Sequence, residues 1–362
     1  LRGCLSVLVY MATLVVPMAG RSSRYPDLRP KWMLSHPMSN TFMGIAAISG
    51  LNLEFFDKIY WVTLQEYQDK YKFEKGYFEE LDEVGLKEKS EIVLLDKETS
   101  SQSETVCEVI KKKNIEGFIF IKDSDGYYEC EIKDGSNQVA YFDLNDMDNI
   151  NARSKSYVEM DHNGVVTNIV EKKVISSTFS SGGYGFSDPQ EFISVYEKLG
   201  EQDGECYVSN IIFEMMLSGS KFNGLKTSNF KDWGTLEAWN KYKSQYKCLF
   251  VDIDGTLVKN SSHHFPPYIG SGEPLKENIA ALNELYDNGK ARIILTTSRP
   301  ERYRQTTCEE LERKGIRFDQ LVMGLPHSQR ILINDFAKSN PYPSAAAINM
   351  PRNKNDLKEL LR

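Results

Sequence analysis

Residues 12–24, ATLVVPMAGRSSR, form the stretch that decides the fold. Its first five residues are apolar and rich in β-branched side chains, which is typical of a short buried strand in a parallel sheet. The strand runs into a loop that contains Gly20, two serines and two arginines. A loop that leaves a parallel strand exposes backbone N–H groups, and these can bind phosphate oxygens. The stretch therefore predicts a phosphate-binding loop at the edge of an α/β sheet.

Apolar strand patterns and helical patterns alternate after this loop. This alternation favours a parallel sheet in an α/β domain. Residues 126–180 instead show short strand patterns with turn signals, and we expect them to cover the substrate. Strands are expected at 56–64, 91–95 and 117–121, and helices at 39–53, 102–113, 205–218 and from Asp232 through Trp239.

A second α/β series begins at Cys248, after a polar stretch from Lys241 to Lys247. A chain of 362 residues is long enough for two cores. We therefore predict two domains, 12–243 and 246–362. In the second domain, strands are expected at 248–252, 291–296 and 330–333, and helices at 275–287, 301–314 and 353–361.

The composition is that of a soluble globular protein, with 41% hydrophobic and 26% charged residues. A net charge of −7 argues against nucleic acid as a partner. Six scattered cysteines without a CxxC pair predict free thiols in a reducing compartment, so we expect a cytoplasmic protein. The apolar run 5–18 leads straight into the loop without a cleavage site, so we expect Met11 as the start, residues 1–10 as an extension, and no membrane partner.

The segment from Gly20 to Lys31 resembles the signature of sugar-phosphate nucleotidylyltransferases, although Arg21-Ser22-Ser23 replaces part of the common G-x-G-T-R form. The resemblance implies a Rossmann-like mixed sheet over about residues 12–240. It also implies catalytic roles for Arg24, on the triphosphate, and for Lys31, on the acceptor and α-phosphates. The nucleotide-binding residues that it implies are Ala19, Gly20, Arg21, Ser22, Ser23, Gln102 and Ser103.

Two carboxylates complete this first site by the same resemblance. Asp125 follows the fourth strand and Asp232 lies in the segment 230–235, where the family carries its metal ligands; Asp123 ranks behind both. Mg²⁺ held there would bridge α- and β-phosphate oxygens and support the departing pyrophosphate. The implied acceptor-binding residues are Glu171, Lys172 and Gly183.

The second domain opens with Asp252-Ile253-Asp254-Gly255-Thr256-Leu257 after an apolar strand. This pattern resembles haloacid-dehalogenase phosphatases. Asp252 would be the nucleophile that forms an aspartyl-phosphate, and Asp254 would protonate the leaving oxygen and then activate water. Gly255 permits the tight turn between them. We expect a Rossmannoid domain without a large cap, because the sequence has no long insertion after Asp254 or Thr297.

The other residues expected in the phosphatase site follow later strands of the second domain. Thr297 and Ser298 are expected to bind phosphate, with Thr296 as runner-up to Thr297. Asp335 is expected to join Asp252 and Asp254 at Mg²⁺, although Asn334 replaces a second acid that family members often carry. The usual lysine is absent; Arg330 is the nearest cation, with Lys314 as an alternative. His263-His264 is interpreted as part of a solvated loop.

The two resemblances together predict a bifunctional enzyme of capsular or other surface polysaccharide precursor synthesis. One domain would join a nucleotide to a phosphorylated sugar or polyol and release pyrophosphate. CTP is favoured, with UTP, GTP and dTTP open. The other would hydrolyse a phosphomonoester. Two alternatives remain: a non-catalytic or regulatory second domain, and a sugar-nucleotide sensor. A homo-oligomer is compatible with the sequence, which does not fix the oligomeric state.

Overall fold

The computed structural model describes residues 11–146, 155–200, 205–337 and 343–361. The extension expected at residues 1–10 lies outside them. The chain divides into two compact units, Leu1–Trp239 (unit 1) and Asn240–Arg362 (unit 2), and the division falls inside the helix Leu236–Lys243 (α7) rather than after it. No helix in the described ranges is long and apolar enough to cross a membrane.

Unit 1 is built on one mixed sheet with the strand order β10-β6-β9-β4-β1-β2-β3; β7 pairs with β9, and β8 pairs with β7. Strands β4, β1, β2 and β3 run parallel, whereas β9 is antiparallel to both β4 and β6. The four parallel strands include the predicted ones, so the expected α/β sheet is confirmed. The strands are Ala12–Pro17 (β1), Lys58–Leu64 (β2), Ser90–Leu95 (β3), Phe118–Lys122 (β4), Gln138–Asp143 (β6), Ser156–Met160 (β7), Val166–Glu171 (β8), Thr178–Phe186 (β9) and Asn223–Lys226 (β10).

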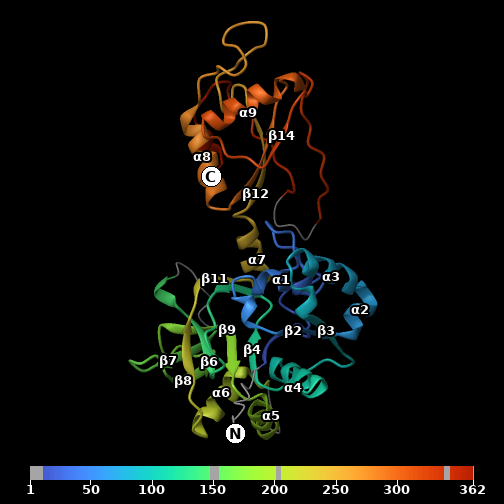
Figure 1. The fold of residues 1–362 in the computed structure, drawn as a ribbon, viewed down its shortest axis with the longest axis vertical. Coiled ribbons are helices and arrows are strands. Elements are labelled where there is room, and N and C mark those ends of the chain that lie inside the picture. The colour runs from blue at the N-terminus through green and yellow to red at the C-terminus, as the bar shows by residue number, and fades with distance from the viewer. Residues whose placement is uncertain (1–10, 147–154, 201–204, 338–342, 362) are drawn as a thin grey trace, which may run out of the picture. The chain divides into compact units, whose positions relative to one another are not determined.

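Helices cover both faces of this sheet (Figure 1). Successive side chains of a strand point to opposite faces, so Val15 of β1 packs in the core under α4, α5 and α6, and Leu14 and Val16 pack in the core under α1 and α3. The helices are Met43–Ile48 (α1), Gln65–Tyr71 (α2), Glu74–Glu83 (α3), Gln102–Lys113 (α4), Pro189–Leu199 (α5) and Val208–Leu217 (α6). The predicted helix 102–113 matches α4, and Ser101 caps it by accepting from the Glu104 N–H.

A small antiparallel ribbon brings two distant acidic segments together. Gly126–Glu129 (β5) pairs with Ser228–Asp232 (β11), and Asp232 lies opposite Gly126 in the register. Asp125 precedes Gly126 in the chain, so this pairing places Asp232 next to Asp125. The backbone N–H of Trp233 also donates to the Asp125 carbonyl at 2.9 Å.

Unit 2 contains a parallel sheet of three strands, β12-β13-β14, with a core that includes residues of α8, α9 and α10. The strand expected at 330–333 is wrong: residues 331–337 form no strand, and Ile333 is 90% exposed. The third strand is instead a three-residue segment with little apolar pattern. The elements are Lys247–Asp252 (β12), Lys276–Asp287 (α8), Ala291–Thr296 (β13), Arg304–Arg313 (α9), Gln320–Val322 (β14) and Leu357–Leu360 (α10).

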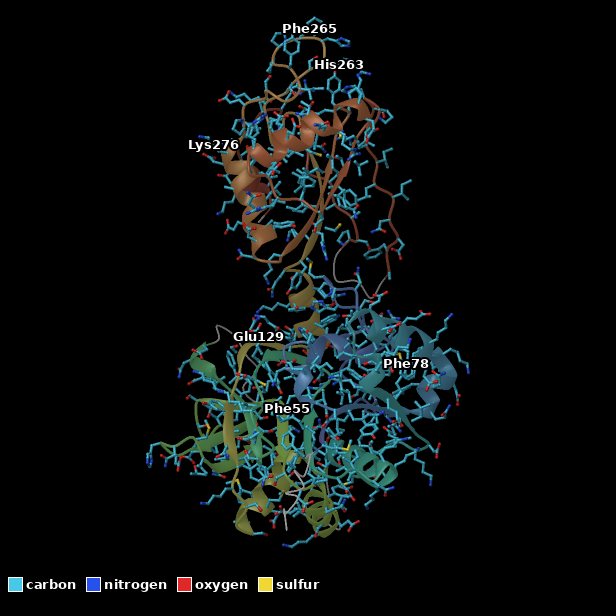
Figure 2. The ribbon with its side chains drawn as sticks, in the orientation of Figure 1. Phe55, Phe78, Glu129, His263, Phe265 and Lys276 are labelled. Atoms are coloured by element: carbon cyan, nitrogen blue, oxygen red, sulfur yellow. The ribbon has the colours of Figure 1, made fainter. Side chains whose placement is uncertain are left out.

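The last expected helix, 353–361, is shorter than predicted because its first residues cap another helix. Asn355 Oδ1 accepts from the N–H groups of Glu277 and Asn278 at the start of α8, at 3.0 and 3.1 Å. Asn353 has a positive φ of 63°, which a helix excludes. His263 and Phe265 lie on the loop between β12 and α8 (Figure 2), and both side chains are exposed, as expected for a solvated loop.

Candidate functional sites

Charged side chains from four separate segments of unit 1 converge beside β5 and β11. Lys31 Nζ lies 2.5 Å from Asp125 Oδ2, and Arg24 Nη2 lies 3.4 Å from the same oxygen. Lys155 Nζ lies 2.7 Å from Asp232 Oδ2. All four residues that the sequence predicts for catalysis and metal binding in this domain therefore lie in one cluster. Lys155 belongs to the cluster but was not predicted.

Gly234 keeps a hollow open between the carboxylates. Its N–H donates to Asp232 Oδ1 at 2.9 Å. A Cβ at this position would lie 3.1 Å from Asp232 Oδ1, 3.3 Å from Arg24 Nη1 and 3.5 Å from Asp125 Oδ2. A hollow bordered by two carboxylates and an arginine fits a Mg²⁺ ion that is held by one or two carboxylates and completes its shell with substrate phosphates. The residues present therefore suit the predicted metal.

The loop after β1 is tied directly to this cluster. Ser22 has a positive φ of 52°, its carbonyl accepts from the Tyr25 N–H at 2.7 Å, and its Oγ accepts from the Lys31 N–H at 3.1 Å. The Tyr25 hydroxyl donates to the Trp233 carbonyl, next to Gly234. Arg21, in contrast, is 76% exposed and pairs with Glu98. The loop thus ties Lys31 to Ser22 and Tyr25 to the Trp233 backbone, while Arg21 forms a surface ion pair.

The electrostatics of the two neighbouring aspartates differ. Burial acts to raise the pKa of Asp125, but the charges of Lys31 and Arg24 outweigh it and hold this pKa below its ordinary value. Burial, reinforced by the charge of Asp125, raises the pKa of Asp123 to about 6. Asp125 is therefore the better candidate for an ionised metal ligand, in agreement with its ranking above Asp123.

Of the two predicted base-contacting residues, Gln102 faces Asp123. Its Nε2 donates to Asp123 Oδ1 at 2.5 Å. Ser103 is fully buried in α4 and its side chain presents no surface to a ligand. Within the predicted acceptor segment, a Cβ on Gly183 would overlap the Tyr128 hydroxyl and Ala140, whereas one on Gly182 would overlap the Asp123 carboxylate. The glycine that adjoins the site is thus Gly182, and Gly183 packs inward.

Glu171 and Lys172 lie at the end of β8, opposite the start of α6. Glu171 Oε2 accepts from the Ser209 hydroxyl at 3.0 Å, and Lys172 Nζ is 2.5 Å from the Tyr207 hydroxyl. Lys172 also fixes the unpredicted cluster member, because its backbone N–H donates to the Lys155 carbonyl at 2.9 Å. The predicted acceptor segment is thus connected to the Asp232 cluster. Sequence reasoning missed Lys155 because no motif surrounds it.

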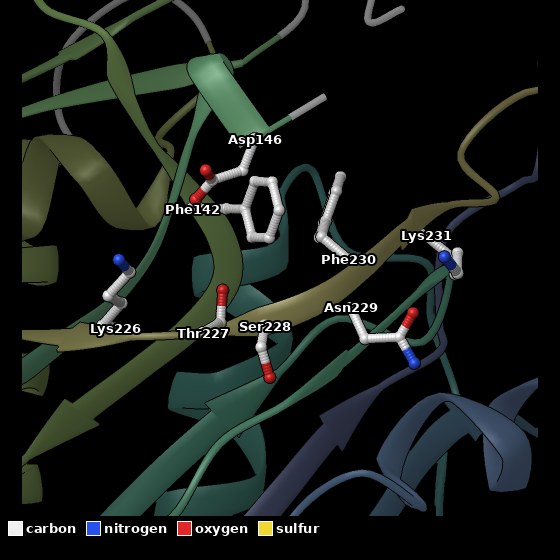
Figure 3. A pocket seen from close by; sticks show the side chains of 8 residues that line it. All are labelled: Phe142, Asp146, Lys226, Thr227, Ser228, Asn229, Phe230 and Lys231. Carbon is white, nitrogen blue, oxygen red and sulfur yellow. The ribbon is translucent and has the colours of Figure 1, made fainter. Parts of the chain in front are cut away.

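A pocket of about 590 Å³ is lined by residues of β10, β11 and the segment between them, together with Phe142 and Asp146 (Figure 3). Phe142 and Phe230 form its aromatic wall, and Lys226 and Lys231 add positive charge. Lys155 Nζ sits 5.2 Å from the centre of the Phe230 ring. Phe230 therefore lines the pocket and also lies beside Lys155, the ion-pair partner of Asp232.

In unit 2 both motif aspartates are held by arginines. Arg330 Nη1 lies 2.9 Å from Asp252 Oδ1. Arg299 contacts both oxygens of Asp254, with Nε at 2.7 Å from Oδ2 and Nη2 at 2.8 Å from Oδ1. The hydroxyls of Ser261 and Thr297 also donate to Asp254, at 2.6 and 3.3 Å. Arg299 and Ser261 were not predicted as members of this site.

Arg299, which holds Asp254, is itself buried and pairs with a second buried carboxylate. Arg299 is 3% exposed, and its Nη1 lies 2.7 Å from Glu310 Oε2, a side chain with no exposed surface. Burial acts to raise the pKa of Asp254, but the hydrogen bonds and charge of Arg299 hold it below its ordinary value. Burial raises the pKa of Asp252 against the opposing effect of Arg330. Asp254 is therefore held in its ionised form by Arg299, and this form is poorly suited to donate a proton.

The acids of unit 2 do not assemble into the expected metal site. Asp335 lies in the exposed segment 331–337, which does not form the predicted strand. Among the described residues, no group of three or more His, Cys, Asp or Glu side chains could hold a metal ion. Arg299 contacts both oxygens of Asp254, and Asp252, Asp254 and Asp335 do not form a group of metal ligands, so the residues present in unit 2 do not fit the expected Mg²⁺ site. The predicted phosphate ligands Thr297 and Arg330 do adjoin the aspartates, and Ser298 follows Thr297.

No protein-family model matches the sequence. A search of curated proteins also finds no match. Solved structures do share the fold. A nucleoside-diphosphate-sugar pyrophosphorylase from Vibrio cholerae RC9 is 19% identical, with a TM-score of 0.54 over 64% of this chain and 100% of its own. An inositol-1-phosphate CTP transferase from T. maritima is 12% identical, with a TM-score of 0.51 over 65% and 94%.

A third structure, an apo UDP-glucose pyrophosphorylase, is 13% identical, with a TM-score of 0.50 over 65% of this chain and 97% of its own. The chain therefore shares the α/β fold of these structures over about two thirds of its length. About a third of it lies beyond these likenesses, so they do not bear on a phosphatase fold in the second domain.

Proposed function

We propose that unit 1 transfers a nucleotidyl group from an NTP to a phosphorylated sugar or polyol and releases pyrophosphate. The observation that carries this proposal is the convergence of Arg24, Lys31, Asp125 and Asp232 around the hollow at Gly234. The solved structures with this fold include proteins named as pyrophosphorylases and as a CTP transferase, which supports the same reaction class.

In this reaction a phosphate oxygen of the acceptor attacks the α-phosphorus of the NTP, and the bond to pyrophosphate breaks. Lys31 and Arg24 would neutralise the charge that accumulates on the α-phosphoryl oxygens. Asp125 and Asp232 would hold Mg²⁺, which supplies charge neutralisation for the phosphates. Lys155 would hold Asp232 in place through its 2.7 Å ion pair.

We further propose that unit 2 is a phosphatase-type domain in which Asp252 attacks a phosphomonoester, and that the whole chain makes a precursor of capsular or other surface polysaccharide in the cytoplasm. The Asp252-x-Asp254 motif after β12, with Thr297 beside Asp254, supports this assignment. A second candidate, a non-catalytic module, is favoured by the two contacts of Arg299 with Asp254 and by the lack of a strand at 331–337, where Asp335 lies.

The deciding experiment for unit 1 is a pyrophosphate-release screen of four NTPs against sugar and polyol phosphates with Mg²⁺. We expect one productive pair, and we expect Lys31→Ala to lower its rate about 10²- to 10³-fold, the usual effect of removing a donor to transition-state charge. Lys87→Ala, which breaks an exposed pair with Asp82, is the control. Nucleotide binding without any turnover would instead support the sensor alternative.

For unit 2, phosphate release is compared between the wild type and Asp252→Asn over a panel of phosphomonoesters and sugar bisphosphates. Release by the wild type alone supports the phosphatase. Equal background release from both proteins supports the non-catalytic module.

A further inference from the structure

Lys122, the last residue of β4, is a charged side chain at a position where the strand pattern predicts an apolar one. Side chains two residues apart lie on the same face of a strand, and Phe118 and Phe120, which share this face of β4, both belong to the hydrophobic core. Lys122 is fully buried with them. A buried charge costs free energy unless polar partners replace the water that it loses. The partners of this ammonium group therefore indicate its role.

The ammonium group closes the turn between β4 and β5. Lys122 Nζ donates to the carbonyl of Asp123 at 2.8 Å and to the carbonyl of Gly126 at 2.7 Å. It also lies 4.6 Å from the centre of the Tyr128 ring, which is a cation–π distance. The two carbonyls flank Asp125 in the chain, so one buried side chain holds both ends of the turn that carries this carboxylate.

The same turn determines where the second carboxylate lies. Gly126 is opposite Asp232 in the pairing of β5 with β11. The Trp233 N–H donates to the Asp125 carbonyl at 2.9 Å, which ties the end of β11 to the turn. The Gly126 carbonyl that Lys122 holds is thus part of the ribbon on which the positions of both carboxylates depend.

Lys122 also brings a positive charge to this acidic turn. Burial lowers its pKa to about 8, and the charges of Asp123 and Asp125 act in the opposite direction. The ammonium form therefore prevails at pH 7. Lys31 and Lys155 contact carboxylate oxygens directly. The hydrogen bonds of Lys122 go to the backbone instead, so they do not compete with a metal for those oxygens.

We propose that Lys122 is a positioning residue that sets the distance between the Asp125 and Asp232 carboxylates for a divalent cation, an inference that rests on the proposed nucleotidyl transfer. Lys122 acts through the backbone of the turn between β4 and β5. Without its donors this turn and the ribbon of β5 and β11 can shift, and the two carboxylates no longer match one Mg²⁺ ion, which demands nearly ideal octahedral geometry. Replacing residues that orient metal ligands typically changes metal affinity or activity about 10- to 100-fold.

The test replaces Lys122 with methionine, which keeps an unbranched side chain in the core but has no hydrogen-bond donor. Pyrophosphate formation is measured at saturating NTP and acceptor while the free Mg²⁺ concentration is varied. For Lys122→Met we expect the Mg²⁺ concentration at half-maximal rate to rise about 10- to 100-fold. A second readout needs no turnover: Mn²⁺ binding in the presence of each NTP, measured by electron paramagnetic resonance, is expected to weaken by a similar factor.

The matched control is Lys89→Met. Lys89 Nζ also donates to two backbone carbonyls, those of Leu53 and Phe56, at 2.9 and 3.1 Å, and these residues do not belong to the site. We expect this variant to keep the wild-type Mg²⁺ dependence. The unfolding temperature is measured for both variants, because a merely structural role of Lys122 would lower the stability and leave the Mg²⁺ dependence unchanged.

A second variant, Lys122→Gln, decides the question if the methionine variant does not fold. Glutamine keeps a donor NH₂ group, but its side chain is one bond shorter and carries no charge. It can therefore satisfy at most one of the two carbonyls. We expect the Mg²⁺ concentration at half-maximal rate to rise about 3- to 10-fold, the effect of one lost hydrogen bond.

The outcomes separate this inference from the function on which it rests. A wild-type Mg²⁺ dependence and Mn²⁺ affinity in either folded Lys122 variant overturn the positioning role and leave nucleotidyl transfer standing. An equal shift in Lys89→Met and Lys122→Met shows a general effect and overturns it as well. If the wild type binds no Mn²⁺ with any of the four NTPs and forms no pyrophosphate, the transfer function fails and the inference fails with it.

Discussion

Both units place two aspartates and an arginine near the ends of strands, but the two arginines pair with their aspartates differently. In unit 1, Arg24 is more than half exposed and reaches Asp125 at 3.4 Å, and Gly234 leaves a hollow between the carboxylates. In unit 2, Arg299 is buried and contacts both oxygens of Asp254. A loosely paired carboxylate can exchange its partner for a metal or a phosphate-bound cation, whereas a buried bidentate pair resists exchange. The same residue types therefore yield a partly exposed arginine pair in unit 1 and a buried bidentate arginine pair in unit 2.

The largest effect is expected when the closed pair is broken. Arg299→Ala leaves Asp254 and Glu310 buried without their common partner, which costs about 3–5 kcal/mol. We expect a clearly lower unfolding temperature for unit 2, measured by calorimetry on the full chain. Arg304→Ala removes an exposed pair with Glu301 and is expected to change the free energy of unfolding by less than about 1 kcal/mol. Equal stability of the two variants would show that the Arg299 clamp is not structural.

The comparison also explains what the sequence could and could not predict. The four expected members of the unit 1 cluster were predicted from the resemblance of the Gly20–Lys31 segment, Asp125 and Asp232 to a known family, and the strand pattern of β1 predicted only the loop that follows it. Lys155 was not, because it reaches Asp232 only through the pairing of β11 with β5 and through the Lys172 backbone. Local pattern carries no information on such long-range contacts.

In unit 2, by contrast, the sequence predicted a strand that the structure does not contain. The apolar run Ile331–Ile333 has strong strand propensity, yet it is exposed and unpaired with the sheet, and the third strand is the unpatterned segment Gln320–Val322. Strand propensity measures how well a side chain fits a sheet surface, and the neighbour that supplies the hydrogen bonds is a tertiary property. Arg299 was missed because the motif identifies Thr297 and Ser298 as phosphate ligands and says nothing about the next residue.

Filling the space at Gly234 in unit 1 tests whether that space is needed for pyrophosphate formation. Gly234→Ala adds a Cβ 3.1 Å from Asp232 Oδ1 and 3.3 Å from Arg24 Nη1, so both groups must shift by a few tenths of an ångström. We expect pyrophosphate formation to fall about 10- to 100-fold, because small displacements of positioning groups cost that much, while the unfolding temperature changes little. Gly76→Ala in α3, where a Cβ meets no atom within 4 Å, is the control. Full activity of Gly234→Ala would argue against a metal between these carboxylates.

A further difference between the units is expected in mild acid. Burial lowers the pKa of His36, in unit 1, to about 4, below its ordinary 6.5. The unfolded chain then binds the proton first, so stability from neutral His36 is present above pH 6.5 and is lost as the pH falls towards 4, by up to about 3 kcal/mol. Asp123, with a raised pKa, acts in the opposite direction in the same window, so the informative quantity is the difference between the wild type and His36→Gln. In unit 2, Asp254 has a lowered pKa, so the stability that its ionised form contributes is lost only below about pH 4. Between pH 6.5 and 4, the difference in free energy of unfolding between the wild type and His36→Gln should therefore change for the unit 1 transition and stay constant for the unit 2 transition. An equal change in both transitions would contradict the burial of an uncharged His36.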